Sequence, residues 1–598
     1  MKRFLGLTAL ADILIVGGMM GSCLSARAES PLLIVYPPPE HETFAEQIFL
    51  IGTSSPQEPV LVNQQEITKR SASGHFSPSF PLKLGENTFV VQQGGKELEL
   101  TITRLSQSPE IPQQLAFAPQ SLTPAIDLAL LPEEPVCVSA IAPTDAKVTA
   151  QIGKSKILLM PQIDSVVLPA NSAVLTDRAI PSTSNNQGYY QGCTTLSIPG
   201  NYGKPVFTLE KNQKTLTKQG QGAIEILAPQ DIQVVEVSAT AGVARTGAST
   251  TYSRLTPLPQ GTRARVIGKE GEWLHLDYGG WIKAAETKPV LGNIPPQSLI
   301  RGIVSRQRAT ATEVIFPLES AVPVSIKQQA DSITLTLHNA TAQTDTIRLD
   351  PDPIIKRLDW QQVSPTQIDY TFELHDQQQW GYDLRYQDAN LIFTLRHPPQ
   401  ASSSELITGD RNQPLLNRKI LLDPGHGGAE KGAKGPTGYP EKAINLKLAK
   451  LVEAKLTELG AIVLLTREDD RDLSLKDRVD MINRWQPDLA ISLHYNALPD
   501  DGDAENTRGI STFWYHTQAH APAIFLHQYL IEQLGRSDAG TFWNNLALTR
   551  PHTAPAILLE LGFMINPEEF EWITDEAEQR RLAKTLANGI AEWFASFK

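Results

Sequence analysis

Four side chains in the C-terminal third of the chain could hold a metal ion or move a proton: His426, Glu441, His494 and Glu560. His426 follows the apolar run "ILLDPG" on a glycine-rich bend, His494 closes "LAISLH", and Glu560 lies within "AILLELGF". Two histidines and one carboxylate are the ligand set of catalytic zinc sites. Zinc lowers the pKa of bound water from about 15.7 to about 7, and a carboxylate that does not bind the metal is needed to accept and return a proton. Two histidines and two glutamates fill these roles.

Each residue also has a purely structural interpretation. A histidine after a glycine turn is commonly a polar loop residue, and Glu441 at a helix start is stabilised by the helix dipole. His494 could be a hydrogen-bonded histidine of a core. Glu560 is harder to explain in this way, because a carboxylate among apolar strand residues costs several kcal/mol unless it is paired or used.

The elements predicted around these residues would bring them together. Apolar strands alternate with amphipathic helices from residue 418 onward, which predicts an α/β domain with a mostly parallel sheet. Ligands of such sheets bind beyond the carboxyl ends of the strands, and His426, His494 and Glu560 lie at or near such ends. The predicted strands contain "RKILLDPG", "AIVLLTR", "DLAISLHYN", "GISTFWY" and "PAILLELGF", and the predicted helices span 441–459, 474–485 and 519–534, with a last one from Thr574.

The segments "LLDPGHGG", "PEK", "LLTREDD", "DRVDMIN", "ISLHYNA" and "APAILLELGFMIN" resemble the zinc-dependent N-acetylmuramoyl-L-alanine amidases of bacteria, in the family's order, across residues 418–598. The resemblance implies that His426, Glu441 and His494 bind one Zn²⁺ and that Glu560 is the catalytic glutamate. It implies peptidoglycan as the substrate, cut between N-acetylmuramic acid and L-alanine. The segment 430–433 departs from the Asp-Pro-Gly-Ala run that the family often has.

Three further residues are candidates for supporting roles. We predict that Asp423 holds the imidazole of His426 and fixes its tautomer. Arg550 and His552 are candidates for contacts with the substrate peptide. The segment from Gly509 to Leu548 leaves room for one strand, one main helix and loops, which predicts no regulatory helix over the metal.

Two other functions remain open. The ligand set does not name the bond that is cut, so another zinc-dependent wall hydrolase, a peptidase or a deacetylase, is one alternative. A non-catalytic wall-binding scaffold is the other, because the β-rich region is more than twice as long as the α/β domain.

The chain as a whole is predicted to be multidomain, with all-β modules followed by the α/β domain. Short alternating strands between Gly, Pro, Asn and Ser clusters fill residues 30 to about 400. Residues 232–290 resemble a bacterial SH3 module, and residues 299–398 faintly resemble the AMIN-type modules that precede cell-wall amidases. The expected domains are a signal peptide at 1–28, an immunoglobulin-like domain at 29–104, a β-rich domain of unknown type at 126–229, an SH3-like barrel at 232–290, an AMIN-like domain at 299–398 and a catalytic domain at 418–598.

The first residues and the overall charge bear on location and partners. A charged start, an apolar run and an Ala-Arg-Ala site at 26–28 predict export to the periplasm or cell envelope, with lipid attachment at Cys23 as the alternative. In that oxidising compartment Cys137 and Cys193 could form a disulfide. The net charge is −12 with no basic block, which argues against nucleic acid. Wall or envelope proteins are the partners expected for the β modules.

Overall fold

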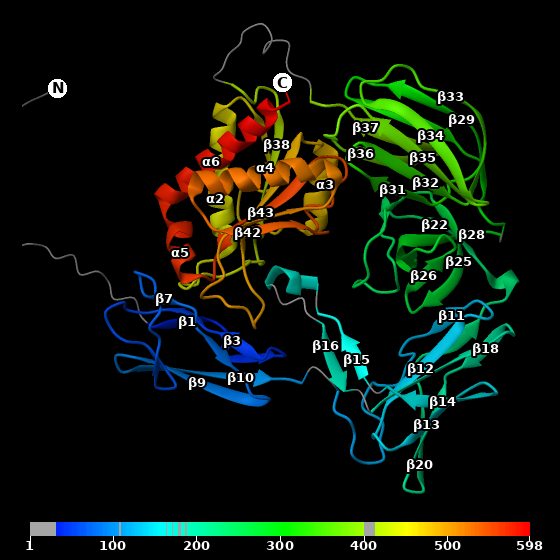
Figure 1. Ribbon diagram of the computed structural model, residues 1–598, viewed down its shortest axis with the longest axis horizontal. Coiled ribbons are helices and arrows are strands. Elements are labelled where there is room, and N and C mark those ends of the chain that lie inside the picture. The colour runs from blue at the N-terminus through cyan, green and yellow to red at the C-terminus, as the bar shows by residue number, and fades with distance from the viewer. Residues whose placement is uncertain are drawn as a thin grey trace, which may run out of the picture.

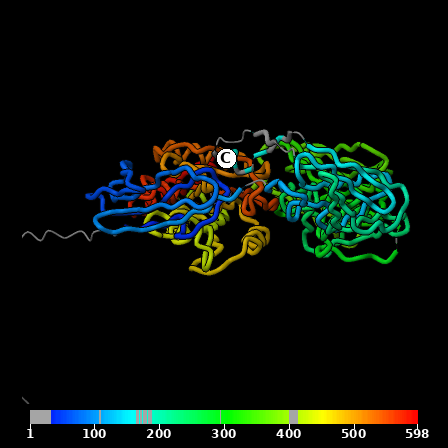
Figure 2. The backbone as a smooth tube through the Cα atoms, turned by 90° about the horizontal axis from the view of Figure 1, so that it is seen from below, coloured from blue at the N-terminus to red at the C-terminus, as the bar shows by residue number. Residues whose placement is uncertain are grey.

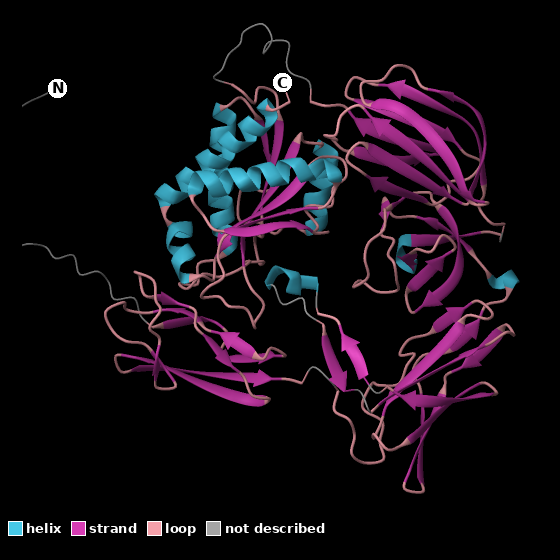
Figure 3. Ribbon diagram, viewed as in Figure 1, coloured by secondary structure: helices cyan, strands magenta, loops and turns pink. Residues whose placement is uncertain are grey.

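The computed structural model describes most of the chain (Figure 1). The ranges described are 32–106, 109–162, 164–169, 171–176, 181–185, 188–292, 294–399 and 413–597. The predicted signal peptide and Cys23 lie outside them. No helix in these ranges has the length and apolar character needed to cross a membrane. Helices of more than six residues are confined to the C-terminal domain of the described chain, and strands dominate everywhere else (Figure 3).

The first domain packs short strands around an apolar core that includes Ile48, Val91 and Ile102. Two larger sheets, with orders β1-β4-β7 and β2-β10-β9-β5-β6, and the pair β3-β8 form it. Its strands are β1 (Leu33–Tyr36), β2 (Glu40–Thr43), β3 (Gln47–Phe49), β4 (Ile51–Thr53), β5 (Leu61–Val62), β6 (Gln65–Glu66), β7 (His75–Phe76), β8 (Ser79–Pro81), β9 (Gly85–Gln93) and β10 (Lys96–Arg104).

The second β region carries the disulfide. Cys137 and Cys193 face each other in the antiparallel pair β12–β17 and are bonded, so the disulfide that the sequence left open is present. Its elements are β11 (Leu128–Leu130), β12 (Pro135–Ile141), β13 (Lys147–Ile152), β14 (Ser155–Pro161), β15 (Asp164–Val167), η1 (Asn171–Thr176), β16 (Ser182–Asn185), β17 (Tyr189–Thr195), β18 (Gly200–Gly203), β19 (Val206–Lys211), β20 (Lys214–Gln219), β21 (Ile224–Ile226) and η2 (Pro229–Asp231).

The next region continues the same sheet across residue 230, because β11 pairs with β25 in the order β18-β21-β11-β25-β22-β28. Trp273 lies in its interior, and Trp281 stacks on His275 with ring centroids 4.4 Å apart. Its elements are β22 (Val234–Val237), β23 (Ala241–Gly242), β24 (Leu258–Pro259), β25 (Arg263–Glu270), β26 (Trp273–Leu276), β27 (Trp281–Lys283), η3 (Ala284–Glu286) and β28 (Thr287–Val290).

Residues 298–396 form two sheets, β33-β29-β30-β37-β36 and β31-β32-β35-β34, that share one core. Every second side chain is buried along β35, and along β32 from Ile333 onward, as expected for strands with one covered face. The strands are β29 (Ser298–Gln307), β30 (Ala311–Pro317), β31 (Val324–Gln328), β32 (Ser332–His338), β33 (Ala340–Arg348), β34 (Ile355–Ser364), β35 (Gln367–Leu374), β36 (Tyr382–Gln387) and β37 (Asn390–Arg396).

The C-terminal domain is a three-layer α/β structure around a mixed sheet of order β39-β38-β40-β43-β41-β42. The pairs β38–β39, β38–β40, β40–β43 and β41–β42 are parallel, and β41 runs antiparallel to β43. Its elements are β38 (Lys419–Pro424), α2 (Glu441–Glu458), β39 (Ile462–Leu465), α3 (Leu475–Trp485), β40 (Leu489–Asn496), β41 (Ile510–Trp514), α4 (Thr517–Leu534), β42 (Asp538–Trp543), β43 (Ala556–Phe563), α5 (Pro567–Thr574) and α6 (Glu576–Ala595).

The two faces of this sheet are covered by different helices. Ile420 and Leu422 belong to the core shared with α2, α4 and α6, whereas Leu421 between them packs with Ile482 of α3. Side chains alternate between the faces of a strand, so this division also fixes where the polar residues of the strands point.

The strand β42 and the short helix α5 were not expected from the sequence. The last helix begins at Glu576, after the side chain of Asp575 accepts bonds from the first turn, whereas the prediction placed its start at Thr574. Helix α4 packs against α6 and β41, as a core helix does.

The N-terminal domain docks on the C-terminal domain, and Figure 2 shows the two as one lobe of the molecule. Phe49 and Ile51 share a buried cluster with Ala504, Phe563 and Ile565. Ala504 lies in the loop after β40, Phe563 is the last residue of β43 and Ile565 follows it, so the first domain lies beside the carboxyl edge of those strands.

Candidate metal centre

The site is built at the carboxyl edge of three adjacent strands. Leu493 and Tyr495 point into the core beneath α2 and α6, and so do Leu559 and Leu561. By alternation, the side chains of His494 and Glu560 therefore point to the opposite face, and these two residues are register partners in β40 and β43.

His426 and Glu441 approach this edge from loop and helix. His426 follows Gly425 after β38 and adopts a left-handed backbone conformation with φ of 61°, which aims the residue out of the strand direction. Glu441 is the first residue of α2 and is 3% exposed. The side chains that the sequence predicts as ligands thus reach one place from three elements.

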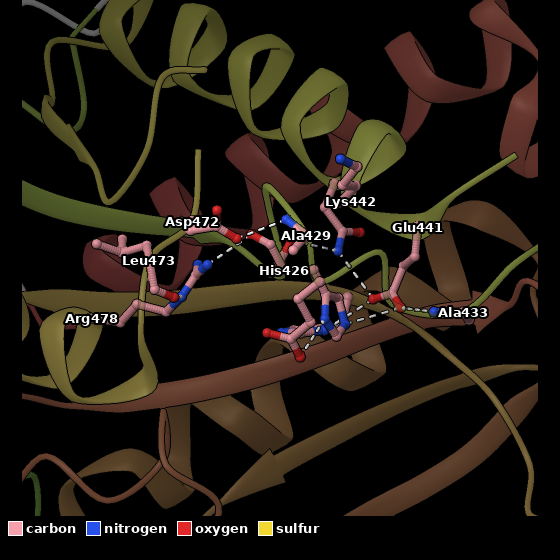
Figure 4. A network of polar contacts seen from close by, with 12 residues as sticks. His426, Ala429, Ala433, Glu441, Lys442, Asp472, Leu473 and Arg478 are labelled. Carbon is pink, nitrogen blue, oxygen red and sulfur yellow. Dashed lines mark hydrogen bonds and ion pairs between the residues drawn. The ribbon is translucent and has the colours of Figure 1, made fainter. Parts of the chain in front are cut away.

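The three predicted ligands lie within bonding reach of one small ion. One ligand atom from each of His426, Glu441 and His494 lies within 4.8 Å of the others. Nε2 of His426 is 3.1 Å from Oε2 of Glu441, and Nδ1 of His494 is 3.0 Å from Oε1 of the same carboxylate. Figure 4 shows the side chains of His426 and Glu441 facing each other.

Glu441 is fixed by its surroundings. Its Oε2 accepts a hydrogen bond from the amide of Ala433 at 2.9 Å, and its Oε1 accepts bonds from Asn445 Nδ2 at 3.0 Å and the amide of Tyr495 at 3.1 Å. Burial favours the neutral acid, but the bonds with the two histidines outweigh burial and hold the pKa of Glu441 well below its ordinary value. The residue is therefore an anion in a fixed orientation, as a metal ligand must be.

Glu560 has a different environment from Glu441. Its Oε2 is shielded from solvent and has no hydrogen-bond partner among the described residues. Burial, followed by the negative charge of Glu441, raises the pKa of Glu560 well above its ordinary value. Two neighbouring carboxylates with pKa values pushed apart are typical of a site in which one carries fixed charge and the other exchanges a proton.

The donor set fits a zinc ion. Two imidazole nitrogens and one carboxylate leave a fourth position open for a ligand, as in catalytic zinc sites. The buried oxygen of Glu560 without a hydrogen-bond partner is a second indication of a functional site, because native structures rarely leave a buried polar atom unpaired.

Asp423 does not hold the imidazole of His426, and that prediction is wrong. Asp423 is 1% exposed, and its carboxylate accepts bonds from Arg478, Thr466 and Ser492, each at 2.6 Å. It points to the face covered by α3, and α3 carries Arg478 to it. Nδ1 of His426 lies instead 3.1 Å from Oε1 of Glu430.

Arg478 connects Asp423 to the histidine loop through the backbone. Its guanidinium donates to the carbonyls of Pro424 at 3.0 Å and His426 at 2.7 Å. The segments "LLTREDD" and "DRVDMIN" contain the residues that hold this loop, but the sequence assigns them no role. Asp470 and Asp472 accept bonds from the amides of Gly428 and Ala429, and Lys442 donates to the carbonyl of Gly428 at 2.7 Å. Several of these contacts are drawn in Figure 4.

Arg550 and His552 do not lie at this site. They precede the amino end of β43, whereas Glu560 lies toward its carboxyl end. Arg550 donates to Oδ1 of Asn545 at 2.7 Å, and the ring of His552 stacks on Tyr382 of the neighbouring β domain. The structure therefore places both residues at the opposite edge of the sheet.

Comparison with known proteins agrees with the geometry of the α/β domain. Residues 420–592 match the family model described as N-acetylmuramoyl-L-alanine amidase. The probable cell wall amidase LytH of Staphylococcus aureus is 34% identical over 191 residues, which are 32% of this chain and 62% of that protein. The chain thus spans 62% of the length of this curated relative.

Two solved structures are similar to part of this chain. One is the catalytic domain of CwlV, an N-acetylmuramoyl-L-alanine amidase from Bacillus (Paenibacillus) polymyxa var. colistinus, with 33% identity over 30% of this chain and 98% of that one, at a TM-score of 0.28. The other is an N-acetylmuramoyl-L-alanine amidase from Clostridium difficile 630, with 31% identity over 30% of this chain and 99% of that one, at a TM-score of 0.29. On the family match, residues 420–592 of this chain form a domain of the N-acetylmuramoyl-L-alanine amidase family.

Proposed function

We propose that this chain hydrolyses peptidoglycan at the amide bond between N-acetylmuramic acid and L-alanine. The observation that carries the proposal is the convergence of His426, Glu441 and His494 beside a buried, unpartnered oxygen of Glu560. The family match and the name of the staphylococcal relative support the same bond and the same polymer.

In this proposal His426, Glu441 and His494 would hold one Zn²⁺. When bound, such an ion polarises a carbonyl and makes hydroxide available near neutral pH. Asn445 and the amides of Ala433 and Tyr495 keep the Glu441 carboxylate from rotating, which keeps the ligand set arranged before substrate arrives.

Glu560 acts as the proton carrier. As water adds to the carbonyl carbon, the Glu560 carboxylate accepts a proton from that water. When the carbon–nitrogen bond breaks, the same carboxyl group returns the proton to the alanine nitrogen, so acid and amine are both formed without another proton source. A pKa raised by burial suits this task, because a carboxyl group that releases protons too readily cannot protonate a departing amine.

The β modules would keep the catalytic domain near its insoluble substrate. A weak binding module linked to a catalyst raises the effective concentration of substrate without any new contact in the active site. The proposal places the chain outside the cytoplasm, in the periplasm or the cell envelope, where other envelope proteins could contact the same modules.

Product analysis tests this function. Purified peptidoglycan is digested with the full chain, with the chelator-treated chain, and with the treated chain after zinc is restored, and the products are identified by mass spectrometry. We expect intact stem peptides with a free L-alanine amino group, lost with chelator and regained with zinc. Shortened stem peptides would identify a peptidase, release of acetate would identify a deacetylase, and the absence of any product would favour a binding scaffold.

A further inference from the structure

A second site lies at the amino edge of β43, away from the metal centre. A cavity of about 560 Å³ opens where the α/β domain meets both the region around β24 and the sandwich of β29–β37. Arg254 enters it from the first of these, Tyr382 from the second, and Tyr515 and Arg550 from the α/β domain. Since the rise along β43 is about 3.3 Å per residue, the start of the strand alone is roughly 13 Å from Glu560.

The cavity is cationic although the chain carries a net charge of −12. Arg254 and Arg550 line it, and no Asp or Glu is among its described lining residues. Within the described chain the guanidinium of Arg254 makes no hydrogen bond or ion pair, and that of Arg550 donates only to Asn545. Two guanidinium groups thus line one cavity to whose wall no described carboxylate contributes.

The two arginines are close enough to influence each other. Burial, followed by the charge of Arg254, lowers the pKa of Arg550 to about 10. Burial and then the charge of Arg245 lower the pKa of Arg254, whereas the negative charge of Glu286 raises it. Glu286 itself accepts a hydrogen bond from the amide of Val243. Arginine side chains stay protonated near neutral pH, so an anion that enters the cavity would reduce the repulsion between Arg254 and Arg550.

Aromatic rings form the rest of the wall. Trp543 is 62% exposed, and its Nε1 donates to the carbonyl of Tyr515 at 2.9 Å, which holds the ring in place. The rings of Tyr515 and Trp543 lie 5.0 Å apart, and Trp514 lines the cavity beside them. His516 adds no charge, because burial lowers its pKa to about 3.

We propose that this cavity binds a carboxylate-bearing stem peptide of peptidoglycan other than the one being cut, an assignment that rests on the proposed function. The planar forks of Arg254 and Arg550 match a carboxylate, and guanidinium groups pair with carboxylates through two parallel bonds. The fixed rings of Tyr515 and Trp543 cover the apolar part of the peptide. Stem peptides recur along the polymer, so one stem can be held here while another reaches Glu560, and the bound stem keeps the enzyme on the wall.

The test is a titration of the full chain with the dipeptide L-Ala-D-Glu, which carries two carboxylates and no bond that the proposed activity cuts. Tryptophan fluorescence and calorimetry report binding. The matched probes are the dipeptide diamide, which lacks both charges, and inorganic phosphate. The variants are Arg254→Gln, Trp543→Ala and Lys269→Gln, the last of which removes one charge from an exposed position of the same β region outside the cavity.

We expect the dipeptide to bind and the diamide to bind at least about tenfold more weakly, because the charge-assisted bonds are lost. Arg254→Gln should lower the affinity for the dipeptide by about tenfold or more. Trp543→Ala should also lower this affinity, and Lys269→Gln should leave it unchanged. Binding should decline as salt rises. Binding of a stem peptide near the metal centre would not depend on Arg254, so the Arg254→Gln variant distinguishes the cavity from the metal centre.

The inference is overturned if the dipeptide does not bind, if the diamide binds as well, or if Arg254→Gln binds like the wild type. Tighter binding of inorganic phosphate than of the dipeptide would also overturn it, because the ligand would then be a phosphate group. Dipeptide binding that depends on Arg254 in a chain that fails to cleave peptidoglycan would refute only the proposed activity. Cleavage without dipeptide binding would refute only this site.

Discussion

The buried pair between Asp423 and Arg478 gives the sharpest prediction about the structure, with Arg478→Met as the perturbation. The two side chains are 1% and 3% exposed, and their charged atoms are 2.6 Å apart. Removing one partner of a buried ion pair costs about 3–5 kcal/mol, because the other charge stays buried. For a domain of this size that corresponds to a decrease of roughly 6–20 °C in the unfolding temperature.

The variant should also weaken the metal centre. Arg478 donates to the carbonyl of His426 at 2.7 Å, and this bond helps to hold a histidine whose φ is 61°. The double variant Asp423→Leu with Arg478→Met removes both charges, so it should recover much of the lost stability without recovering zinc affinity.

Calorimetric unfolding of the full chain measures the first effect, and zinc competition with a chromophoric chelator measures the second. Lys476→Met on the exposed side of the same helix is the control. The reasoning is refuted if Arg478→Met unfolds at the wild-type temperature. It is also refuted if the double variant is destabilised, relative to wild type, by the sum of the effects of Asp423→Leu and Arg478→Met.

Two other predictions concern the edges of the α/β domain. Glu569 accepts bonds from the amides of Gly509 and Phe563, and burial raises its pKa from 4.5 to about 7. Because the pKa of Glu569 is higher in the folded state, this carboxyl group stabilises the fold at low pH. Its contribution to the free energy of unfolding, about 3 kcal/mol, is lost as the pH rises from 4.5 to about 7. The unfolding temperature of wild type should therefore decrease over this range relative to that of Glu569→Gln, and parallel profiles would contradict the assignment. Phe49 is 2% exposed in the cluster that joins the N-terminal domain to the loops after β40 and β43, so Phe49→Ala should cost about 3–5 kcal/mol of packing there. Hydrogen exchange in 497–509 should rise in this variant and not in Leu84→Ala, at a position 64% exposed; equal protection in both would count against the docked arrangement.

The elements that hold the predicted ligands could be read from the sequence because their signals are local. Long apolar runs identify β38, β40 and β43, and the periodicity after Glu441 identifies α2, so topology alone brings four side chains to one edge. The strand β42 lacks such a signal, since its sequence "DAGTFW" has a glycine in the middle and little burial. Helix α5 has only eight residues and begins at a proline after the Asn566 cap.

The contacts that side chains make across the sheet could not be predicted from the sequence in the same way. Whether Asp423 meets His426 or Arg478 depends on which face α3 covers, and neither residue's neighbours in the sequence indicate that. Arg550 and His552 were assigned to the substrate because they precede the strand of Glu560, but a strand separates its two ends by its whole length.

Zinc content measured on the same samples whose cleavage products are analysed tests the central claim most directly. Wild type, Glu560→Gln and His494→Ala are compared after purification without added chelator. The account predicts one equivalent of zinc and cleavage in wild type, one equivalent without cleavage in Glu560→Gln, and loss of both in His494→Ala. A wild-type chain that cleaves without metal, or Glu560→Gln that cleaves at the wild-type rate, would contradict it.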